Sequence, residues 1–430
     1  MPPVSTPTPG ATPSTSTGPS GGTSPGGASS GGASRTPTLA EVVAVLERRY
    51  PGRTAVAWDR VGLVAGDPAE PVRRVHLAVD VTADVVDEAL AAGADLLVVH
   101  HPLLLRGVHG VAADTWKGAL VHRLVRGGVA LLTAHTNADA AAEGVNEALA
   151  RAIGLRDLRP LAPAPADPLD TLVAFVPVED ADRLVDALAA AGAGALGDYT
   201  RCAWTTTGTG TFEPSPGARP ARGEVGRRAE VAEARVEMVL PRHRRAAVVA
   251  ALRAVHPYEE PAFDVLELAD LPGSTGLGRV GTLPAPLTLD ALARRVAEAL
   301  PGTAGGVRYA GEPDGEVRTV AVCGGSGDSL LDEVRASGAD AFVTADLRHH
   351  PASEARERAL FEARTGRRPA ATPYLVDAAH AASEWPWLPL AAAALTADLA
   401  GAGATVEVHV STLRTDPWTA RVDAAPGGTL

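Results

Sequence analysis

A long internal match is the feature that most constrains how this chain can fold. Residues 72–99 and residues 317–344 align without a gap, so the offset between them is 317 − 72 = 245. Both segments contain the pattern DE-x-x-A-x-GAD, which begins at Asp87 in the first copy and Asp332 in the second. Similar strand–helix–strand patterns can arise by chance in α/β proteins, but this run of identities favours an internal duplication. We therefore predict two related halves.

Strand-like and helix-like segments alternate around the first copy. The strand-like segments are residues 72–81, 95–102 and 129–135, and the helix-like segments are residues 83–94 and 114–128. Such alternation is typical of a mainly parallel sheet with helices on its faces. The same pattern returns from about Gly276. We therefore expect an α/β fold with an internally duplicated α/β core.

The middle of the chain departs from this alternation. Residues 171–268 are predicted to form strand, helix, strand, a Gly/Pro/Arg-rich stretch, strand, helix and strand, which suits a ferredoxin-like α+β unit. The N-terminal residues are almost wholly Ser, Thr, Gly, Pro and Ala, a composition that predicts disorder. The expected organisation is a disordered tail at 1–37, a first core half at 38–165, an inserted domain at 168–270 and a second core half at 275–425.

The same offset pairs two histidine and carboxylate motifs. It places His135 on His380 and Asp139 on Glu384, so each histidine ends an apolar strand and is followed four residues later by an acid. Alone, Asp139 would be interpreted as a helix cap and Glu384 as an acid in a first helical turn. Their repetition favours a metal site, because neutral imidazole and carboxylate groups are common metal ligands.

Two further strand ends carry suitable groups. His100 and His101 end one strand, and Asp346 lies shortly before His349 and His350. Ligands of open α/β sheets bind at the carboxyl ends of the strands. Adjacent histidines on an extended segment point to opposite sides, so each can serve its own ion. We therefore predict two divalent ions, either zinc, iron or manganese, in a site without thiolate ligands.

The other histidines receive a simpler interpretation. His76, His109, His122, His243 and His409 are taken as ordinary surface or core residues.

Two glycine-containing loops are open to more than one interpretation. GGSGDS at 324–329 could cradle a phosphate with its backbone N–H groups, but it lacks the Walker lysine, and a tight turn explains it equally well. WDRVGLVAGDP at 58–68 contains Asp59 and Asp67, and its chemistry alone indicates only a loop.

Composition narrows the cellular setting and the partners. Two cysteines cannot form a disulfide framework, and no secretory signal pattern is evident, so we expect a cytoplasmic protein. No apolar run approaches the roughly 20 residues of a membrane span, so we expect no membrane association. The formal net charge of −12 disfavours binding to the phosphate backbone of nucleic acids.

Taken together, the motifs resemble a known family. WDRVGLVAGDP, VVHHPLL, HTNADAA, GLGRVG, VAVCGGSG, TADLRHH and HAASE occur in the order seen in the GTP cyclohydrolase I type 2 homologues, also called the Ngg1-interacting-factor-3-like dinuclear metal proteins. The resemblance covers about residues 38–420. It implies a duplicated α/β core that holds two divalent metals in a toroidal homohexamer. The middle domain resembles the insert of longer bacterial members, and HPYEEPAFDV resembles PII-type and copper-tolerance folds.

The resemblance also implies roles for individual residues. The family's metal ligands fall on His100, His101, Asp139, His380 and Glu384. Glu384 is then the expected bridge between the ions, His135 a neighbour that could transfer protons, and His350 a histidine that lines the cavity. The chain departs from the family pattern at Arg60, Ala345-Asp346 and the WPW of 385–387, which concerns substrate contacts more than metal ligands.

The family name implies hydrolysis of a nucleotide, through opening of the GTP purine ring. A phosphoester hydrolase could use the same two metals. The alternative function is a non-catalytic regulatory or scaffold protein that binds metal and whose inserted domain binds a small ligand or a partner.

Overall fold

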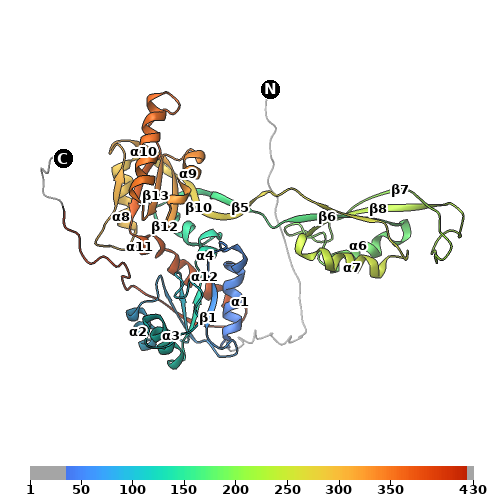
Figure 1. Cartoon of the computed structure of the whole chain (residues 1–430), viewed down its shortest axis with the longest axis horizontal. Coiled ribbons are helices and arrows are strands. Elements are labelled where there is room, and N and C mark those ends of the chain that lie inside the picture. Colours follow the sequence, from blue (N-terminus) through green and yellow to red (C-terminus); the bar gives the residue numbers. More distant parts are fainter. Residues whose placement is uncertain (1–34, 424–430) are drawn as a thin grey trace, which may run out of the picture.

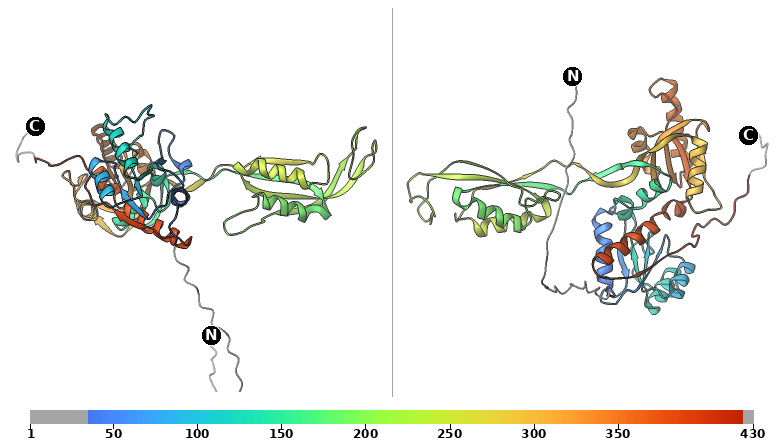
Figure 2. Two further views of the ribbon diagram at one scale, coloured as in Figure 1. Left: turned by 90° about the horizontal axis from the view of Figure 1, so that it is seen from below. Right: turned by 180° about the vertical axis from the view of Figure 1, so that it is seen from behind.

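The computed structural model describes residues 35–423 (Figure 1). The N-terminal tail was predicted to be disordered, and its residues 1–34 lie outside the described part of the chain. Arg35 already forms a β-bridge with Ala404. An α/β core and a smaller α+β lobe are joined by the long strands β5 and β10, so the smaller lobe projects to one side (Figures 1 and 2). Within the described residues, no helix is both long enough and apolar enough to cross a membrane.

The first sheet has five strands in the order β1-β4-β3-β2-β15. These are β1 (Gly62–Ala65), β2 (Arg74–Ala78), β3 (Leu96–Val99), β4 (Ala130–Thr133) and β15 (Glu407–Val410). β4, β3, β2 and β15 run parallel, and β1 is antiparallel. All residues of β3 and β4 are buried, as expected for a sheet covered on both faces.

Helices cover both faces of this sheet. Along β3, Leu96 and Val98 pack on one face, whereas Leu97 and Val99 pack on the other. The first face is covered by α1 (Leu39–Arg49) and α12 (Trp387–Gly401), and the second by α2 (Ala83–Ala91) and α3 (Trp116–Arg126). The helix α1 begins with a capping box between Thr38 and Glu41.

The second sheet has six strands in the order β11-β14-β13-β12-β10-β5. These are β5 (Arg156–Pro165), β10 (Pro272–Thr288), β11 (Arg308–Ala310), β12 (Glu316–Ser326), β13 (Ala341–Ala345) and β14 (Tyr374–Ala378). β12, β13 and β14 are parallel, and the outer strands pair antiparallel. Its helices are α5 (Val145–Ala152), α8 (Leu289–Ala299), α9 (Leu331–Ser337) and α10 (His349–Arg364). The predicted mixed α/β fold with several sheets is therefore confirmed.

The two core sheets exchange strands. β5 precedes the smaller lobe in the chain but pairs with β10 in the second sheet, and β15 follows the second sheet but pairs with β2 in the first. Two five-residue helices lie between the sheets, α4 (Thr136–Ala140) and α11 (His380–Glu384) (Figure 1). The two halves are thus interlocked.

The smaller lobe contains one antiparallel sheet in the order β7-β8-β6-β9, with two helices packed on one face. Its elements are β6 (Leu169–Pro177), α6 (Ala181–Ala190), β7 (Trp204–Phe212), β8 (Ala229–Pro241), α7 (Arg245–Val255) and β9 (Phe263–Glu267). Short 3-10 helices occur at η1 (Gly52–Thr54), η2 (Val178–Asp180), η3 (Arg242–Arg244) and η4 (Asp328–Leu330).

Candidate metal centre

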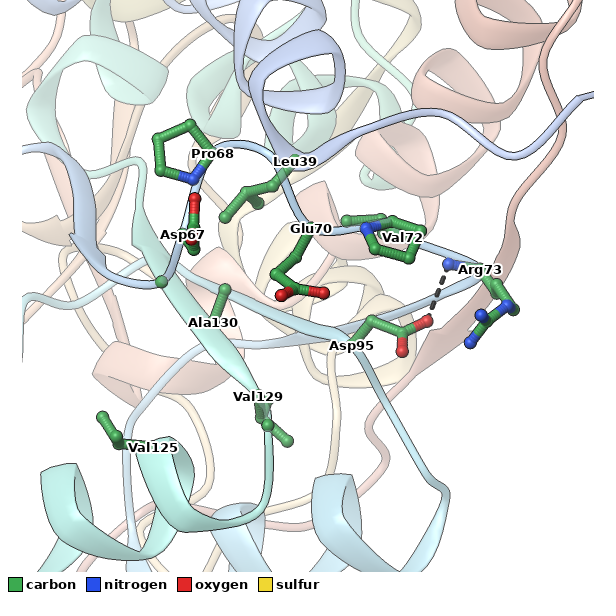
Figure 3. A pocket seen from close by; sticks show the side chains of 13 residues that line it. Leu39, Asp67, Pro68, Glu70, Val72, Arg73, Asp95, Val125, Val129 and Ala130 are labelled. Atoms are coloured by element: carbon green, nitrogen blue, oxygen red, sulfur yellow. Dashed lines mark hydrogen bonds between the residues drawn. The ribbon is translucent and has the colours of Figure 1, made fainter.

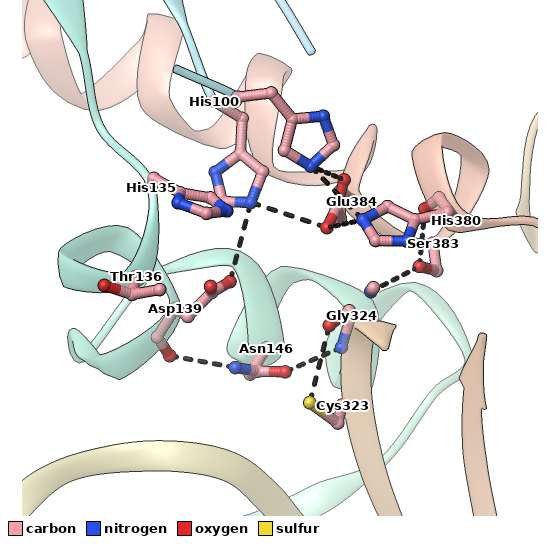
Figure 4. A network of polar contacts seen from close by, with 12 residues as sticks. His100, His135, Thr136, Asp139, Asn146, Cys323, Gly324, His380, Ser383 and Glu384 are labelled. Carbon is pink, nitrogen blue, oxygen red and sulfur yellow. Dashed lines mark hydrogen bonds and ion pairs between the residues drawn. The ribbon is translucent and has the colours of Figure 1, made fainter. Parts of the chain in front are cut away.

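The five predicted ligands meet between the two core sheets, and Figure 4 labels all of them except His101, which contacts Glu384. His100 and His101 directly follow β3, and Asp139 lies in α4, just after β4. His380 and Glu384 begin and end α11, which follows β14. Each therefore stands at the carboxyl end of a buried strand, where ligands of α/β sheets bind.

The Glu384 carboxylate lies at the centre of the cluster. Its Oε2 atom is 3.1 Å from His101 Nε2, and its Oε1 atom is 3.1 Å from His380 Nε2 and 3.5 Å from His100 Nε2. Asp139 Oδ1 lies 3.7 Å from His100 Nε2. Two ligands of a tetrahedral ion with bonds of about 2.0–2.1 Å lie about 3.3 Å apart. The donor atoms thus have separations that suit shared metal ions.

Several donor atoms of the cluster lack hydrogen-bond partners. His100 Nε2, Asp139 Oδ1 and Glu384 Oε2 are buried, and none forms a hydrogen bond with any described residue. Buried polar atoms are normally satisfied, because leaving them unpaired costs free energy. These three atoms instead lie 3.1–3.7 Å from an oppositely charged or polarisable partner in the cluster, an arrangement that fits one or more cations.

A glycine lets the backbone approach this cluster. Gly325, in the GGSGDS loop, has a φ of +66°, and a Cβ atom there would lie 2.4 Å from Glu384 Oε1 and 3.0 Å from His380 Nε2. A side chain at this position would collide with the donor atoms. In this structure residues 324–326 form the end of β12 and Asp328 begins η4, so the segment is the passage from a strand to a 3-10 helix, with Gly325 packed against the cluster.

Acceptors on the outer side of each ring orient the histidines. His100 Nδ1 lies 2.9 Å from the Ala134 carbonyl oxygen, which can only accept a hydrogen bond. This nitrogen therefore carries a hydrogen atom and donates the bond. His101 Nδ1 lies 2.8 Å from Asp80, and His380 Nδ1 lies 2.7 Å from Asp346. With Nδ1 as donor in each neutral ring, the Nε2 lone pair is left for a metal ion, an arrangement typical of metal-binding histidines.

The carboxylates and imidazoles of the cluster change each other's proton affinity. Burial alone would raise the pKa of Glu384, but the charges of His101 and His100 hold it well below its usual value. Burial also opposes protonation of the histidines, yet the Glu384 charge raises the pKa of His101 to about 11, and a hydrogen bond to Glu384 raises the pKa of His380 to about 9. The centre therefore favours positive charge, which a divalent cation can supply in place of protons.

Asp139 is in a different electrostatic state. Burial raises its pKa, and although the charge of His100 opposes this shift, the charge of Glu384 adds to it. A nearby cation would favour its ionised form.

His135 lies beside the ligands rather than among the atoms around Glu384. Its ring centroid is 5.0 Å from that of His100, and its Nδ1 atom is 2.9 Å from Asp59 Oδ1. Asp59 also accepts hydrogen bonds from the N–H and hydroxyl of Thr136. These hydrogen bonds outweigh burial and lower the pKa of Asp59, so it is ionised and orients the imidazole. Donor atoms of His100, His101 and His135 also lie within 4.8 Å of one another.

His350 does not join the cluster. It is exposed in the first turn of α10, where its ring contacts His349 at a centroid distance of 5.1 Å. Its expected place in the cavity therefore rests on the motif match alone.

A cavity of about 800 Å³ opens next to His101 and His380. The C-terminal segment 411–423 forms part of its wall, with Trp418 and Arg421, and Arg308 lines it as well. Thr415 in this segment donates a hydrogen bond to Asp80, which in turn contacts His101. The segment thus reaches His101, one of the predicted ligands, through one intervening side chain.

A second cavity of equal volume lies at the opposite end of the first sheet (Figure 3). It is lined by apolar side chains such as Leu39 and Val129 and by the acids Asp67, Glu70 and Asp95. Asp95 accepts a hydrogen bond from the Arg73 backbone N–H, at 2.7 Å. The two cavities have equal volumes, so volume does not distinguish them. Only the first one lies beside a cluster of converging donor atoms, which makes it the candidate site.

Sequence patterns gave no role to three residues that shape the centre. Asp59 stood in a segment whose chemistry alone indicated a loop, although the segment was one of the motifs that resemble the family, and Asp80 was interpreted only as part of a strand. Trp387 is fully buried, with its ring centroid 5.6 Å from that of His100, and its Nε1–H donates to the Tyr50 hydroxyl. Only Asp80 carried a usable signal, because it stands at the carboxyl end of a strand in the same sheet as His100.

Comparison with known proteins gives a consistent result. Residues 37–417 match the family described as Duf34/NIF3 (NGG1p interacting factor 3). A Mycobacterium leprae protein named GTP cyclohydrolase 1 type 2 homolog is 50% identical over 383 residues, covering 88% of this chain and 94% of that protein. A Streptomyces coelicolor protein of the same name is 40% identical, covering 91% of this chain and 96% of that protein.

Solved structures agree with these sequence matches. The crystal structure of a Bacillus cereus protein related to NIF3 matches with a TM-score of 0.72 and 35% identity, covering 90% of this chain and all of that one. A Staphylococcus aureus protein matches with a TM-score of 0.74 and 26% identity, covering 89% of this chain and 98% of that one.

Proposed function

Because this chain belongs to the Duf34/NIF3 family, we propose that its central cluster is a dinuclear divalent-metal centre that hydrolyses a nucleotide. In this proposal His100 and Asp139 would hold one ion, His101 and His380 would hold the other, and Glu384 would contribute to both. Zinc, iron and manganese all suit these nitrogen and oxygen donors.

One observation carries the proposal. Buried donor atoms of His100, Asp139 and Glu384 lie in one cluster without hydrogen-bond partners among the described residues, and they come from both halves of the core. A cluster with only a structural role could satisfy these atoms with one another or with nearby backbone groups.

The surrounding residues support hydrolysis. Two divalent ions in such a site supply Lewis acidity and lower the pKa of water. Asp59 holds His135 through Nδ1, so the opposite nitrogen can accept a proton from a water molecule and return it to the product. Asp80 and Asp346 keep the Nε2 atoms of His101 and His380 directed at Glu384.

A nucleotide is the substrate class that the surroundings favour. The curated relatives carry GTP cyclohydrolase in their name, with the word homolog. The cavity beside the ligands holds the exposed indole of Trp418, on which a base could stack, and the guanidinium groups of Arg308 and Arg421, which could approach phosphates. Arg308 also pairs with Asp377 at 2.7 Å, so a phosphate would have to compete with this acid.

Metal loading combined with a nucleotide panel tests this function. The purified chain is stripped with a chelator, reloaded with zinc, iron or manganese, and assayed with nucleoside mono-, di- and triphosphates for ring opening and for phosphate release. We expect turnover that depends on the metal and returns on reloading. No turnover of any nucleotide by the fully loaded protein would contradict the hydrolase proposal.

A second candidate function is regulatory. A separate cavity of about 440 Å³ lies in the smaller lobe, lined by Phe175, Phe212, Glu233 and Tyr258 among others. The Tyr258 hydroxyl donates a hydrogen bond to Glu233 at 2.9 Å, which gives this cavity a defined polar group. If the protein is regulatory, the metal centre would turn over no substrate. A ligand bound in the smaller lobe would then alter the metal affinity or the assembly of the core.

Finer features of the organisation also belong to this proposal. The strand order β7-β8-β6-β9, with one helix after β6 and one after β8, supports an inserted ferredoxin-like domain. The parallel runs β2-β3-β4 and β12-β13-β14, each with an antiparallel edge strand beside its last member, support an internal duplication. We further propose a cytoplasmic homohexamer, which light scattering of the full chain would test.

A further inference from the structure

A second group of histidines and a carboxylate lies elsewhere on the first sheet. His76 is on β2, His409 is its register partner on the parallel strand β15, and Glu88 is on α2. The two rings stack with centroids 4.7 Å apart and planes at 28°. The sequence patterns had indicated two ordinary histidines, because they are 333 residues apart (409 − 76) and belong to no motif.

The donor atoms of this group converge. His76 Nε2 lies 3.0 Å from Glu88 Oε2, and His409 Nε2 lies 3.7 Å from Glu88 Oε1. One donor atom from each of the three residues falls within 4.8 Å of the others. Neighbouring ligands of tetrahedral zinc lie about 3.3 Å apart, so these separations need little adjustment.

The carboxylate is held in place from the side. The buried Ser411 hydroxyl donates to Glu88 Oε2 at 2.6 Å, and the Ser411 backbone N–H donates to the Leu77 carbonyl at 2.8 Å. Burial lowers the pKa of His76 despite the nearby Glu88 charge, which favours the neutral imidazole that metals bind. Burial opposes ionisation of Glu88, but hydrogen bonds from Ser411 and His76 lower its pKa.

Solvent reaches the outer side of the group. The His409 side chain is 51% exposed and that of Glu88 26%, whereas His76 is fully buried. Three protein ligands therefore leave a position that water can occupy, as zinc coordination allows.

We propose that His76, Glu88 and His409 bind one divalent transition-metal ion, with zinc as the best match, separately from the central cluster. The ion ties the edge strand β15 to β2 and α2. Since β15 leads into the segment whose Thr415 contacts Asp80, the ion also steadies the wall of the central cavity.

Its affinity should be lower than that of the central site. His76 Nδ1 is buried and has no acceptor among the residues that the structure describes, whereas each of the three central histidines has one. Loss of such an acceptor behind a histidine ligand typically weakens metal binding 10–100-fold. We therefore expect this site to bind metal more weakly than the central site by about that factor.

Counting zinc in a background with a weakened central site tests the proposal. Full-length Glu384→Ala is titrated with Zn²⁺ and counted by native mass spectrometry, alone and combined with His409→Ala. We expect one zinc fewer in the double variant, together with a smaller rise in melting temperature on adding Zn²⁺. Equal counts and equal melting shifts would overturn the proposal, whatever the central site retains.

Two further variants guard against a folding artefact. Glu88→Gln keeps the side-chain size and can still accept from Ser411, and it should lose the same zinc. His109→Ala removes an exposed histidine from a loop outside the group and should keep it. If Glu88→Gln retained the zinc, the assignment of the ligands would be wrong.

Discussion

The two motifs matched by the internal offset, HTNAD and HAASE, have the same spacing but different surroundings. Glu384 lies within 3.5 Å of three imidazole nitrogens, whereas Asp139 Oδ1 lies 3.7 Å from one. The pKa of Glu384 is therefore held low by the histidine charges that outweigh burial, while burial raises the pKa of Asp139. Two positions related by the sequence offset thus lie in different electrostatic surroundings.

The facing residues explain the difference. At the offset of 245, His100 and His101 correspond to Ala345 and Asp346, so only the first half presents a pair of imidazoles. Glu384 faces that pair. In turn, Asp346 supports His380 from behind, as Asp80 supports His101.

The largest expected effect separates the two carboxylates. Glu384→Gln removes the proposed bridge, so we expect both ions to be lost, with affinity falling well beyond the 10–100-fold typical of a lost supporting residue. Asp139→Asn should lose one ion and keep the other. Metal content after dialysis measures this, with the exposed Glu354→Gln as control. Equal losses in both variants would contradict different roles.

The next effect separates the two histidines. His135→Ala should retain metal but lower turnover about 10²–10⁴-fold, the range of general acid–base catalysis. His380→Ala should lose metal itself. Metal analysis and kcat on the same preparations distinguish these outcomes, and His122→Ala is a control. Loss of metal from His135→Ala would make this residue a ligand.

A smaller effect concerns the supporting acids. Asp80→Asn and Asp346→Asn should each weaken metal binding about 10–100-fold, because each leaves one histidine ring less well oriented. Competition with a chromophoric chelator measures the affinities. If only Asp80→Asn had an effect, the support would be confined to the first half.

The last prediction concerns the pH dependence of metal binding, which changes no side chain. The pKa values of about 11 for His101 and about 9 for His380 mean that both are protonated at neutral pH without a cation. A cation must displace these protons, so affinity should fall as pH falls, about tenfold per pH unit for each proton released. Calorimetry in buffers of different ionisation enthalpy counts the protons. No proton release at pH 7 would contradict these shifts.

The sequence indicated which side chains would come together, but not the residues that surround them. The spacing of His135 and Asp139 recurs at the offset, and strand ends were expected to face one site, so a cluster of histidines and acids could be predicted there. The choice of five ligands among them came from the family resemblance. The partners of Asp59 and Asp80 could not, because their roles depend on how separate segments pack. The exchange of β5 and β15 also left no local pattern, since pairing of distant strands is not encoded in periodicity.

The junction between the core and the smaller lobe has a further consequence. Pro165 at the end of β5 is the register partner of Pro272 at the start of β10, and the Ala166 N–H donates to the Leu271 carbonyl. The lobe is thus grafted onto the tip of a β-hairpin whose two arms belong to the core. A tight turn in its place would keep the connectivity of the second sheet, so we expect a chain without the lobe to keep the predicted ligands in place.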